Sequence, residues 1–194
     1  MGQPLTKPSL QEFVEWENQQ TERHELLRGS VIAMVGTRRV HGLIALNIAA
    51  SLMTQLKGSP GQVFAHSMKL KVGADTILYP DVFVTCDAAD LRADQVFTAP
   101  TVVVEVLSPS TQSHDRGSKF TLYRSLPSVR EYMLVDPDTR EVQLFRRGAD
   151  GLFTLHDMTG REQIRLDSVG CDLLASDVFD GVETEAGEQI SLPV

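Results

Sequence analysis

Apolar and polar residues alternate along the chain in two periods, which together predict a mixed α/β fold. The clearest helical signal covers residues 40–56, where large apolar side chains recur every three or four positions. Lys57-Gly58 and the following Pro60 are typical of a helix end. On either side of this segment, short apolar runs bounded by turn residues predict strands. We therefore expect a mixed sheet with a long helix early in the chain.

Further elements follow from the same patterns. Residues 24–35 predict two short strands joined by a tight turn at Arg28-Gly29. Asp136-Pro137-Asp138 predicts the turn of a hairpin. Other strands are expected at 63–72, 77–86, 102–107, 131–135, 142–145 and, as an edge strand, 152–155. Helices are expected at 9–20, where Ser9 and Glu12 form a capping-box pattern, at 113–126 before Pro127, and as one turn within 173–179.

The length and composition are those of one globular domain. We expect a single domain over residues 1–194, because no repeat or long linker divides the chain. No apolar run approaches the roughly 18 residues of a membrane span, and the N-terminus lacks a signal-peptide core. Cys86 and Cys171 stand alone, which favours free thiols in a reducing cytoplasm over a single disulfide. These features predict a cytoplasmic protein with no membrane contact.

The net charge of −8 argues against a surface that holds nucleic acid by charge alone. It does not exclude nucleic acid as a substrate, because a metal-dependent site is itself a cluster of carboxylates. Binding to DNA would then depend on local basic patches, for example Arg38 with Arg39 or Lys69 with Lys71. Each patch taken alone is as typical of a solvated protein surface.

Two acidic residues interrupt apolar strands. Glu105 lies in a run of β-branched residues typical of a strand covered on both faces, where a carboxylate needs a cation or an ion pair. Asp81 follows Pro80, which breaks, bulges or ends the strand because proline cannot donate a ladder hydrogen bond. Each residue also has a purely structural alternative. Glu105 could lie at an exposed strand end or pair with a basic side chain. Pro80-Asp81 could simply form a turn. Two such carboxylates in neighbouring strands favour a divalent-cation site.

A third acidic and basic motif lies in the helix expected after the Glu105 strand. Asp115, Lys119 and Tyr123 are spaced four apart, so on an α-helix they share one face. An exposed Asp115–Lys119 pair is the structural interpretation. The functional interpretation is that Lys119 reaches the scissile phosphate or a water bound to the metal.

These segments resemble the PD-(D/E)XK nuclease superfamily, and more closely the Uma-two family of bacterial endonucleases. The resemblance rests on residues 25–29, His41 at the start of the long helix, residues 79–82, the Glu-Val-Leu-Ser-Pro-Ser-Thr run from Glu105, the downstream Asp115, Lys119 and Tyr123, and residues 131–137. It implies an α/β restriction-endonuclease-like core, a mixed β-sheet flanked by helices. The core would cover about residues 22–157, with a C-terminal extension over 158–194.

The resemblance also implies roles for individual residues. Asp81 and Glu105 would bind Mg²⁺ or Mn²⁺ with the Val106 carbonyl, and Lys119 would assist catalysis. Glu25, His41, Asp115 and Tyr123 are further candidates, although His41 is equally explained as a residue that caps its helix. The lysine that the superfamily places two residues after the acid is here Leu107. Lys119 would take over its role.

The expected function is therefore a metal-dependent endonuclease that hydrolyses phosphodiester bonds in DNA. The alternative is an inactive module that keeps the nuclease fold and binds nucleic acid or a protein partner. We also expect a homodimer, since a break in both strands needs two centres or two encounters. The apolar hairpin over residues 131–145, if it lay at a sheet edge, would invite pairing with another copy.

Overall fold

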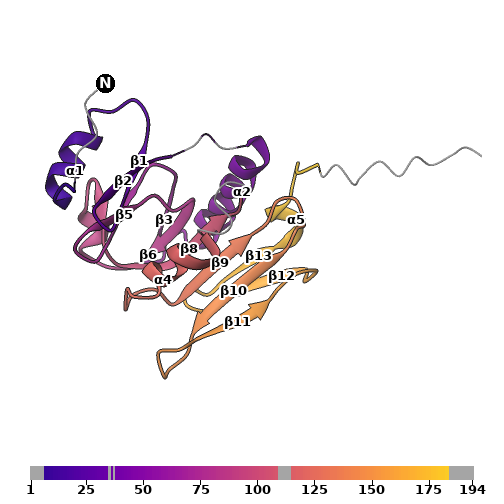
Figure 1. The fold of residues 1–194 in the computed structure, drawn as a ribbon. Helices are drawn as coiled ribbons and strands as arrows, with labels where there is room; N and C mark the ends of the chain where they lie inside the picture. The colour runs from indigo at the N-terminus through magenta and orange to yellow at the C-terminus, as the bar shows by residue number, and fades with distance from the viewer. Residues whose placement is uncertain (1–6, 35, 37, 109–114, 184–194) are drawn as a thin grey trace, which may run out of the picture.

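The computed structural model describes residues 7–34, 36, 38–108 and 115–183. Figure 1 shows α1 with the strands β1, β2 and β5 at one end of the molecule and β10 to β13 at the other. The helices are α1 (Leu10–Glu17), α2 (Arg39–Gln55), η1 (Asp90–Arg92), the π-helical turn η2 (Asp115–Lys119), α4 (Phe120–Tyr123) and α5 (Ala175–Val178). The strands are β1 (His24–Leu27), β2 (Ser30–Ala33), β3 (Gln62–Ala65), β4 (Lys69–Val72), β5 (Thr76–Leu78), β6 (Val82–Thr85), β7 (Val96–Phe97), β8 (Pro100–Val106), β9 (Glu131–Val135), β10 (Val142–Arg147), β11 (Phe153–Asp157), β12 (Gln163–Leu166) and β13 (Cys171–Leu174).

The central six-stranded sheet has the order β11-β10-β9-β8-β6-β3. Its strands pair antiparallel except for β8 and β9, which are parallel. Strand β8 lies inside the sheet, and its side chains from Val102 to Val106 are buried on both faces. The mixed α/β class expected from the sequence is confirmed.

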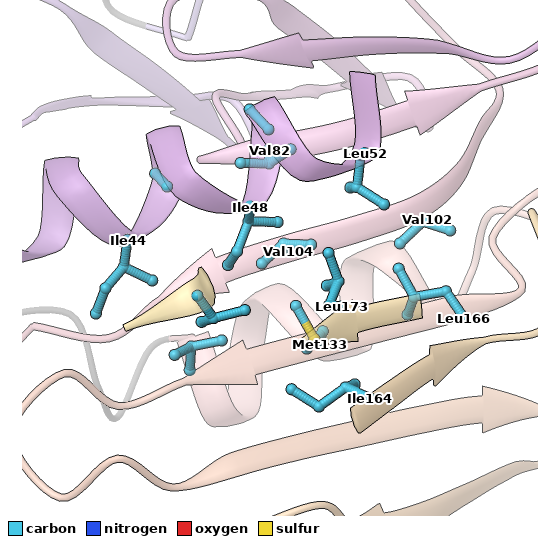
Figure 2. Close-up of a cluster of buried hydrophobic side chains, with 14 of the residues drawn as sticks. Ile44, Ile48, Leu52, Val82, Val102, Val104, Met133, Ile164, Leu166 and Leu173 are labelled. Carbon is cyan, nitrogen blue, oxygen red and sulfur yellow. The ribbon is translucent and has the colours of Figure 1, made fainter. Parts of the chain in front are cut away.

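One face of the sheet packs against α2. Val102, Val104 and Val106 of β8 point to this face and join Ile44, Ile48 and Leu52 of the helix in one apolar cluster (Figure 2). The separate β12–β13 hairpin and α5 complete the cluster with Ile164, Leu166, Leu173 and Val178. Residues after 158 therefore belong to the same core as α2 and the central sheet.

The other face of the central sheet packs against a second sheet of five strands, in the order β2-β1-β5-β4-β7. Val103 and Leu107 point to this side, in a cluster with Phe83, Phe97 and Tyr132. Helix α1 covers the five-stranded sheet through Phe13, which contacts Leu26 and Ile77. The expected capping box of α1 is present, with Ser9 and Glu12 exchanging hydrogen bonds.

Two expected strands are each divided between the two sheets, so the predictions over residues 63–72 and 77–86 were wrong in that respect. The first breaks at His66 and Ser67, which adopt positive φ, and yields β3 in the central sheet and β4 in the other. The second breaks at Tyr79-Pro80-Asp81 into β5 and β6. Each break is only three residues long and has apolar strand residues on both sides, which hides it from a period count, although Pro80 indicated the second break.

The hairpin of β9 and β10 forms around the expected Asp136-Pro137-Asp138 turn, but it is not at an edge. Strand β9 lies between β8 and β10, and β10 is covered by β11. The edge-pairing reason for a homodimer was therefore wrong, since β11 occupies that edge. Strands β7, β12 and β13 were not expected, because they are short and their apolar residues are too few to show a period.

The five-residue turn η2 differs from the regular α-helix expected over residues 113–126, and residues 113 and 114 lie outside the described ranges. Within those ranges, no helix is long and apolar enough to cross a lipid bilayer.

Helix α2 allows a direct test of this packing. Ile48 is fully buried against the central sheet, whereas Met53 on the same helix is 61% exposed. We expect Ile48→Ala to lower the free energy of unfolding by about 2–5 kcal/mol, because it removes buried methyl groups and leaves a cavity. Met53→Ala should change it by less than about 0.5 kcal/mol. Urea unfolding of both variants measures the difference, and equal effects would contradict the packing of α2.

Candidate active site

Asp81 and Glu105 lie at neighbouring strand ends in the central sheet. Asp81 directly precedes β6, which runs antiparallel to β8 with Val82 opposite Val104. One residue further along this register, Asp81 faces Glu105 across the two strands. Pro80 explains why the chain leaves the five-stranded sheet just before this point, since it has no N–H to donate to a ladder.

The Asp81 carboxylate is held by two neighbours. Its Oδ2 accepts a hydrogen bond of 2.8 Å from the backbone N–H of Val106 and lies 3.2 Å from Nε2 of His41. His41 is buried in the first turn of α2. The long helix therefore meets the acidic residue at its N-terminal end.

Glu105 is only 2% exposed and points to the face opposite α2. Its Oε1 accepts a 2.7 Å hydrogen bond from the Tyr123 hydroxyl and lies 3.3 Å from Nζ of Lys119. Burial, followed by the nearby Glu105 and Glu25 charges, raises the pKa of Tyr123 well above its usual value. Tyr123 therefore stays protonated near neutral pH and can donate to the carboxylate.

Lys119 joins Glu105 to a third carboxylate. Its Nζ is also 3.3 Å from Oε1 of Glu25 on β1, and the Lys119 side chain is itself buried. The backbone N–H of Tyr79 donates to the same Glu25 oxygen at 3.2 Å. The Lys119 ammonium thus brings together side chains from three separate segments of the chain: β1, β8 and the helical segment that carries Lys119.

The turn η2 and helix α4 bring Lys119 and Tyr123 to this cluster. These two residues are four apart and both contact Oε1 of Glu105, as expected for one helical face. Asp115 lies at the other end of η2, where the wider π-helical turn departs from α-helical spacing. The Asp115 side chain lies outside the described residues.

Leu107 occupies the position where the superfamily pattern has a lysine. It is buried in the apolar cluster between the two sheets, with Val103 and Tyr132. A lysine there would have to replace a core side chain. Lys119 approaches Glu105 from the helical side instead.

The donor atoms fit a hard cation only in combination with outside ligands. Among the described residues, no three His, Cys, Asp or Glu side chains form a cluster that could hold a metal ion. Mg²⁺ is commonly bound by one or two carboxylates, with water and substrate phosphates completing its coordination. Asp81 and Glu105 offer such a pair. The N–H and C=O of a strand residue point to the same neighbouring strand, so the Val106 carbonyl also faces the Asp81 side.

The sequence did not single out Glu17, His24 or Tyr79 as a group. Glu17 is fully buried and accepts hydrogen bonds from the Tyr79 hydroxyl and from the backbone N–H of His24. One signal was present: Glu17 is an acidic residue in the last turn of a helix, where the helix dipole disfavours negative charge.

The central sheet carries Asp81 and Glu105 at neighbouring strand ends, with the buried Lys119 and the long helix α2 beside them. A crystal structure of a putative nuclease of the DUF820 group from Anabaena variabilis superposes with a TM-score of 0.73, covering 89% of this chain and 97% of that one. Sequence identity is 17%, so the likeness concerns the fold. The mixed α/β fold with sheets flanked by helices, expected from the sequence, is confirmed and is shared with this neighbour.

The chain belongs to the Uma2 family, described as "Putative restriction endonuclease", which residues 10–174 match. It is 33% identical to an uncharacterized protein of Synechocystis over 180 residues, covering 92% of this chain and 95% of that protein. A second uncharacterized Synechocystis protein is 27% identical over 152 residues, covering 77% of this chain and 86% of that protein. The family resemblance is thus confirmed, and it supports nuclease function in general terms.

The contacts of Lys119 can be tested through the stability of a variant that lacks the ammonium group. Lys119→Met leaves Glu25 and Glu105 buried without their shared cation, which should cost about 3–5 kcal/mol at pH 8. Protonation removes buried negative charge, so the folded variant binds protons more tightly than the unfolded chain. Its stability deficit should therefore shrink as the pH falls to about 5. Urea unfolding at both pH values measures this change.

Arg147→Met is the control. Arg147 is partly buried, and its guanidinium donates to backbone carbonyl oxygens, among them those of Val129 and Arg124 at 2.7 Å. These acceptors do not titrate, so the loss of Arg147 should cost the same at pH 5 and pH 8. A deficit of Lys119→Met that is equally independent of pH would show that the two carboxylates do not rely on this ammonium.

Proposed function

We propose that this protein is a metal-dependent endonuclease that hydrolyses phosphodiester bonds in DNA. One observation carries the proposal: a buried lysine contacts two buried carboxylates beside Asp81, at the end of a sheet in a Uma2-family chain. Buried charges are costly unless paired, and such clusters are common at functional sites.

Asp81 and Glu105 would hold Mg²⁺ or Mn²⁺, with the Val106 carbonyl as a further oxygen ligand. When bound, such an ion supplies Lewis acidity toward the phosphate and the attacking water. His41 keeps the Asp81 carboxylate oriented through its 3.2 Å contact. Tyr123 does the same for Glu105 as a protonated hydrogen-bond donor.

Lys119 would place a positive charge beside the scissile phosphate, where negative charge develops in the transition state. Glu25 and Glu105 hold the Lys119 ammonium from two sides, which limits its movement. A preorganised charge of this kind stabilises the transition state without reorganising during the reaction.

Binding to DNA would begin at the N-terminal end of α2. Arg38 and Arg39 are exposed there, and no acidic residue lies in the first turn. His41, in the first turn of the helix, contacts Asp81. A helix N-terminus favours anions, and cations placed there are more stable with a phosphate nearby.

The alternative is a module that keeps the fold and binds nucleic acid or a protein without cutting. Two observations favour it: the net charge of −8, and Leu107 in the position of the usual lysine. Cleavage assays separate the two candidates, because only the endonuclease requires the acidic pair for turnover.

Incubation with supercoiled plasmid and Mg²⁺ or Mn²⁺ should yield nicked or linear DNA. Asp81→Asn should abolish cleavage, and Lys119→Ala should lower turnover about 100-fold or more, the scale of losing one preorganised charge. Lys119→Arg keeps the charge and should retain more activity than Lys119→Ala if charge is the role of the residue. Asp150→Asn, which alters an exposed carboxylate in the turn between β10 and β11, is the control for loss of negative charge. Intact plasmid and RNA at high protein concentration would favour the non-cutting module.

Arg39 tests the DNA-binding surface separately from catalysis. Fluorescence anisotropy with a DNA duplex in EDTA measures affinity without metal-dependent cleavage. Arg39→Ala should weaken binding and reduce the slope of log K against log salt by about 0.9, the value for one lost phosphate contact.

Arg92→Ala is the control, and it should change neither the affinity for DNA nor the slope of log K against log salt. Arg92 is exposed in η1, whose Asp90 contacts Thr85 and Ala99 at the end of the sheet away from Asp81. Equal effects of the two variants would contradict binding at the start of α2.

A further inference from the structure

Glu17, the last residue of α1, is a fully buried carboxylate outside the acidic centre. Its Oε1 accepts hydrogen bonds from the backbone N–H of His24 at 2.9 Å and from the Tyr79 hydroxyl at 3.1 Å. Its Oε2 lies 3.0 Å from Nδ1 of His24. Three donor groups therefore surround one side chain that has no exposed surface.

This location is unfavourable for a carboxylate in two ways. Burial removes the hydration of the charge, and the C-terminal end of a helix carries negative partial charge. The apolar contacts of α1 are already made by Phe13 with Leu26 and Ile77. Glu17 is therefore not needed to hold α1 against the five-stranded sheet, and its buried carboxylate has to be explained in another way.

Tyr79 connects Glu17 to the acidic centre. Its hydroxyl donates to Glu17, while its backbone N–H donates to Oε1 of Glu25, the oxygen that also contacts Lys119. Burial and the Glu17 charge raise the pKa of Tyr79, so the phenol remains a donor at neutral pH. Tyr79 is thus bound at both ends, once by its side chain and once by its backbone.

The chain after Tyr79 is the segment that carries Asp81. Pro80 restricts its own φ and disfavours the α region for Tyr79, so little rotation is left between Tyr79 and Asp81. A shift of Tyr79 would move Glu25 through the hydrogen bond and Asp81 through the backbone. Both parts of the acidic centre therefore depend on where Tyr79 lies.

We infer that Glu17 is a positioning residue for the acidic centre, acting through the Tyr79 hydroxyl on Glu25, Lys119 and Asp81. The catalytic consequence of this inference rests on the proposed endonuclease function. The structural consequence, a fixed Tyr79 N–H···Glu25 hydrogen bond, does not.

The test uses Glu17→Leu, which removes the oxygen that accepts from Tyr79, together with Tyr79→Phe and the double variant. Each single change should lower kcat about 10- to 100-fold with little change in KM, the range for residues that orient the groups binding a metal. Because both changes break the same link, the double variant should lose no more than the worse single one. Additive losses in the double variant would overturn the link through the Tyr79 hydroxyl.

Glu131→Leu is the matched control. Glu131 is also fully buried and accepts from Arg146 and from the backbone of residues 167 and 168, but it lies at the start of β9, away from Asp81. Glu131→Leu should lower the free energy of unfolding, while kcat of the folded protein stays within about twofold. If Glu17→Leu behaves in the same way, Glu17 has only a structural role and the inference is wrong.

Amide hydrogen exchange gives a readout that needs no activity. In Glu17→Leu, the Tyr79 amide should exchange about tenfold faster or more, relative to the Val103 amide at the centre of β8, which reports global opening. Unchanged relative exchange would overturn the inference. If the wild type cleaves no nucleic acid while Tyr79 exchange rises as expected, the proposed function fails and the positioning of Glu25 by Glu17 stands.

Discussion

The ammonium group of Lys119 lies 3.3 Å from a carboxylate oxygen of Glu25 and 3.3 Å from one of Glu105. All three side chains are buried, so each charge depends on the others for the stabilisation that water would otherwise give. Glu25 comes from the five-stranded sheet, Glu105 from the central sheet, and Lys119 from the helical segment beside them. The same contacts that offset the cost of burial therefore hold these three parts of the fold in register.

Strand β8 is a second constraint on the structure, because its side chains alternate between the two faces of the central sheet. Val102, Val104 and Val106 contact the α2 side, while Val103 and Leu107 contact the side between the sheets. Glu105 lies on the second side and reaches Lys119 and Tyr123 there. The backbone N–H of Val106 donates a hydrogen bond to the Asp81 carboxylate. A single-residue slip of β8 would exchange the two sets of side chains and bury Glu105 against α2.

The position of Lys119 in the helical segment, and of Leu107 after β8, has a packing consequence. Leu107 adds apolar surface to the core between the sheets, where a lysine would need a charged partner. Lys119 approaches from the start of α4, next to Tyr123, so both contact one oxygen of Glu105. The fold, which is shared with the Anabaena variabilis protein, thus brings Lys119 to Glu105 from a different segment of the chain.

The amino-acid sequence by itself determined the fold class, the long α2 helix, the capping of α1, the β9–β10 hairpin and the unusual setting of Glu105 and Asp81. These features depend on local periodicity and on the chemistry of adjacent residues, which a sequence displays directly. Only the tertiary structure decided that residues 63–72 and 77–86 each divide between two sheets, and that β11 covers the hairpin. It also decided that Glu25 and Glu105 share Lys119, and that Glu17 reaches Tyr79 across 62 positions of the chain. Such contacts join residues far apart in sequence, and their geometry follows from how the two sheets pack, which no local pattern encodes.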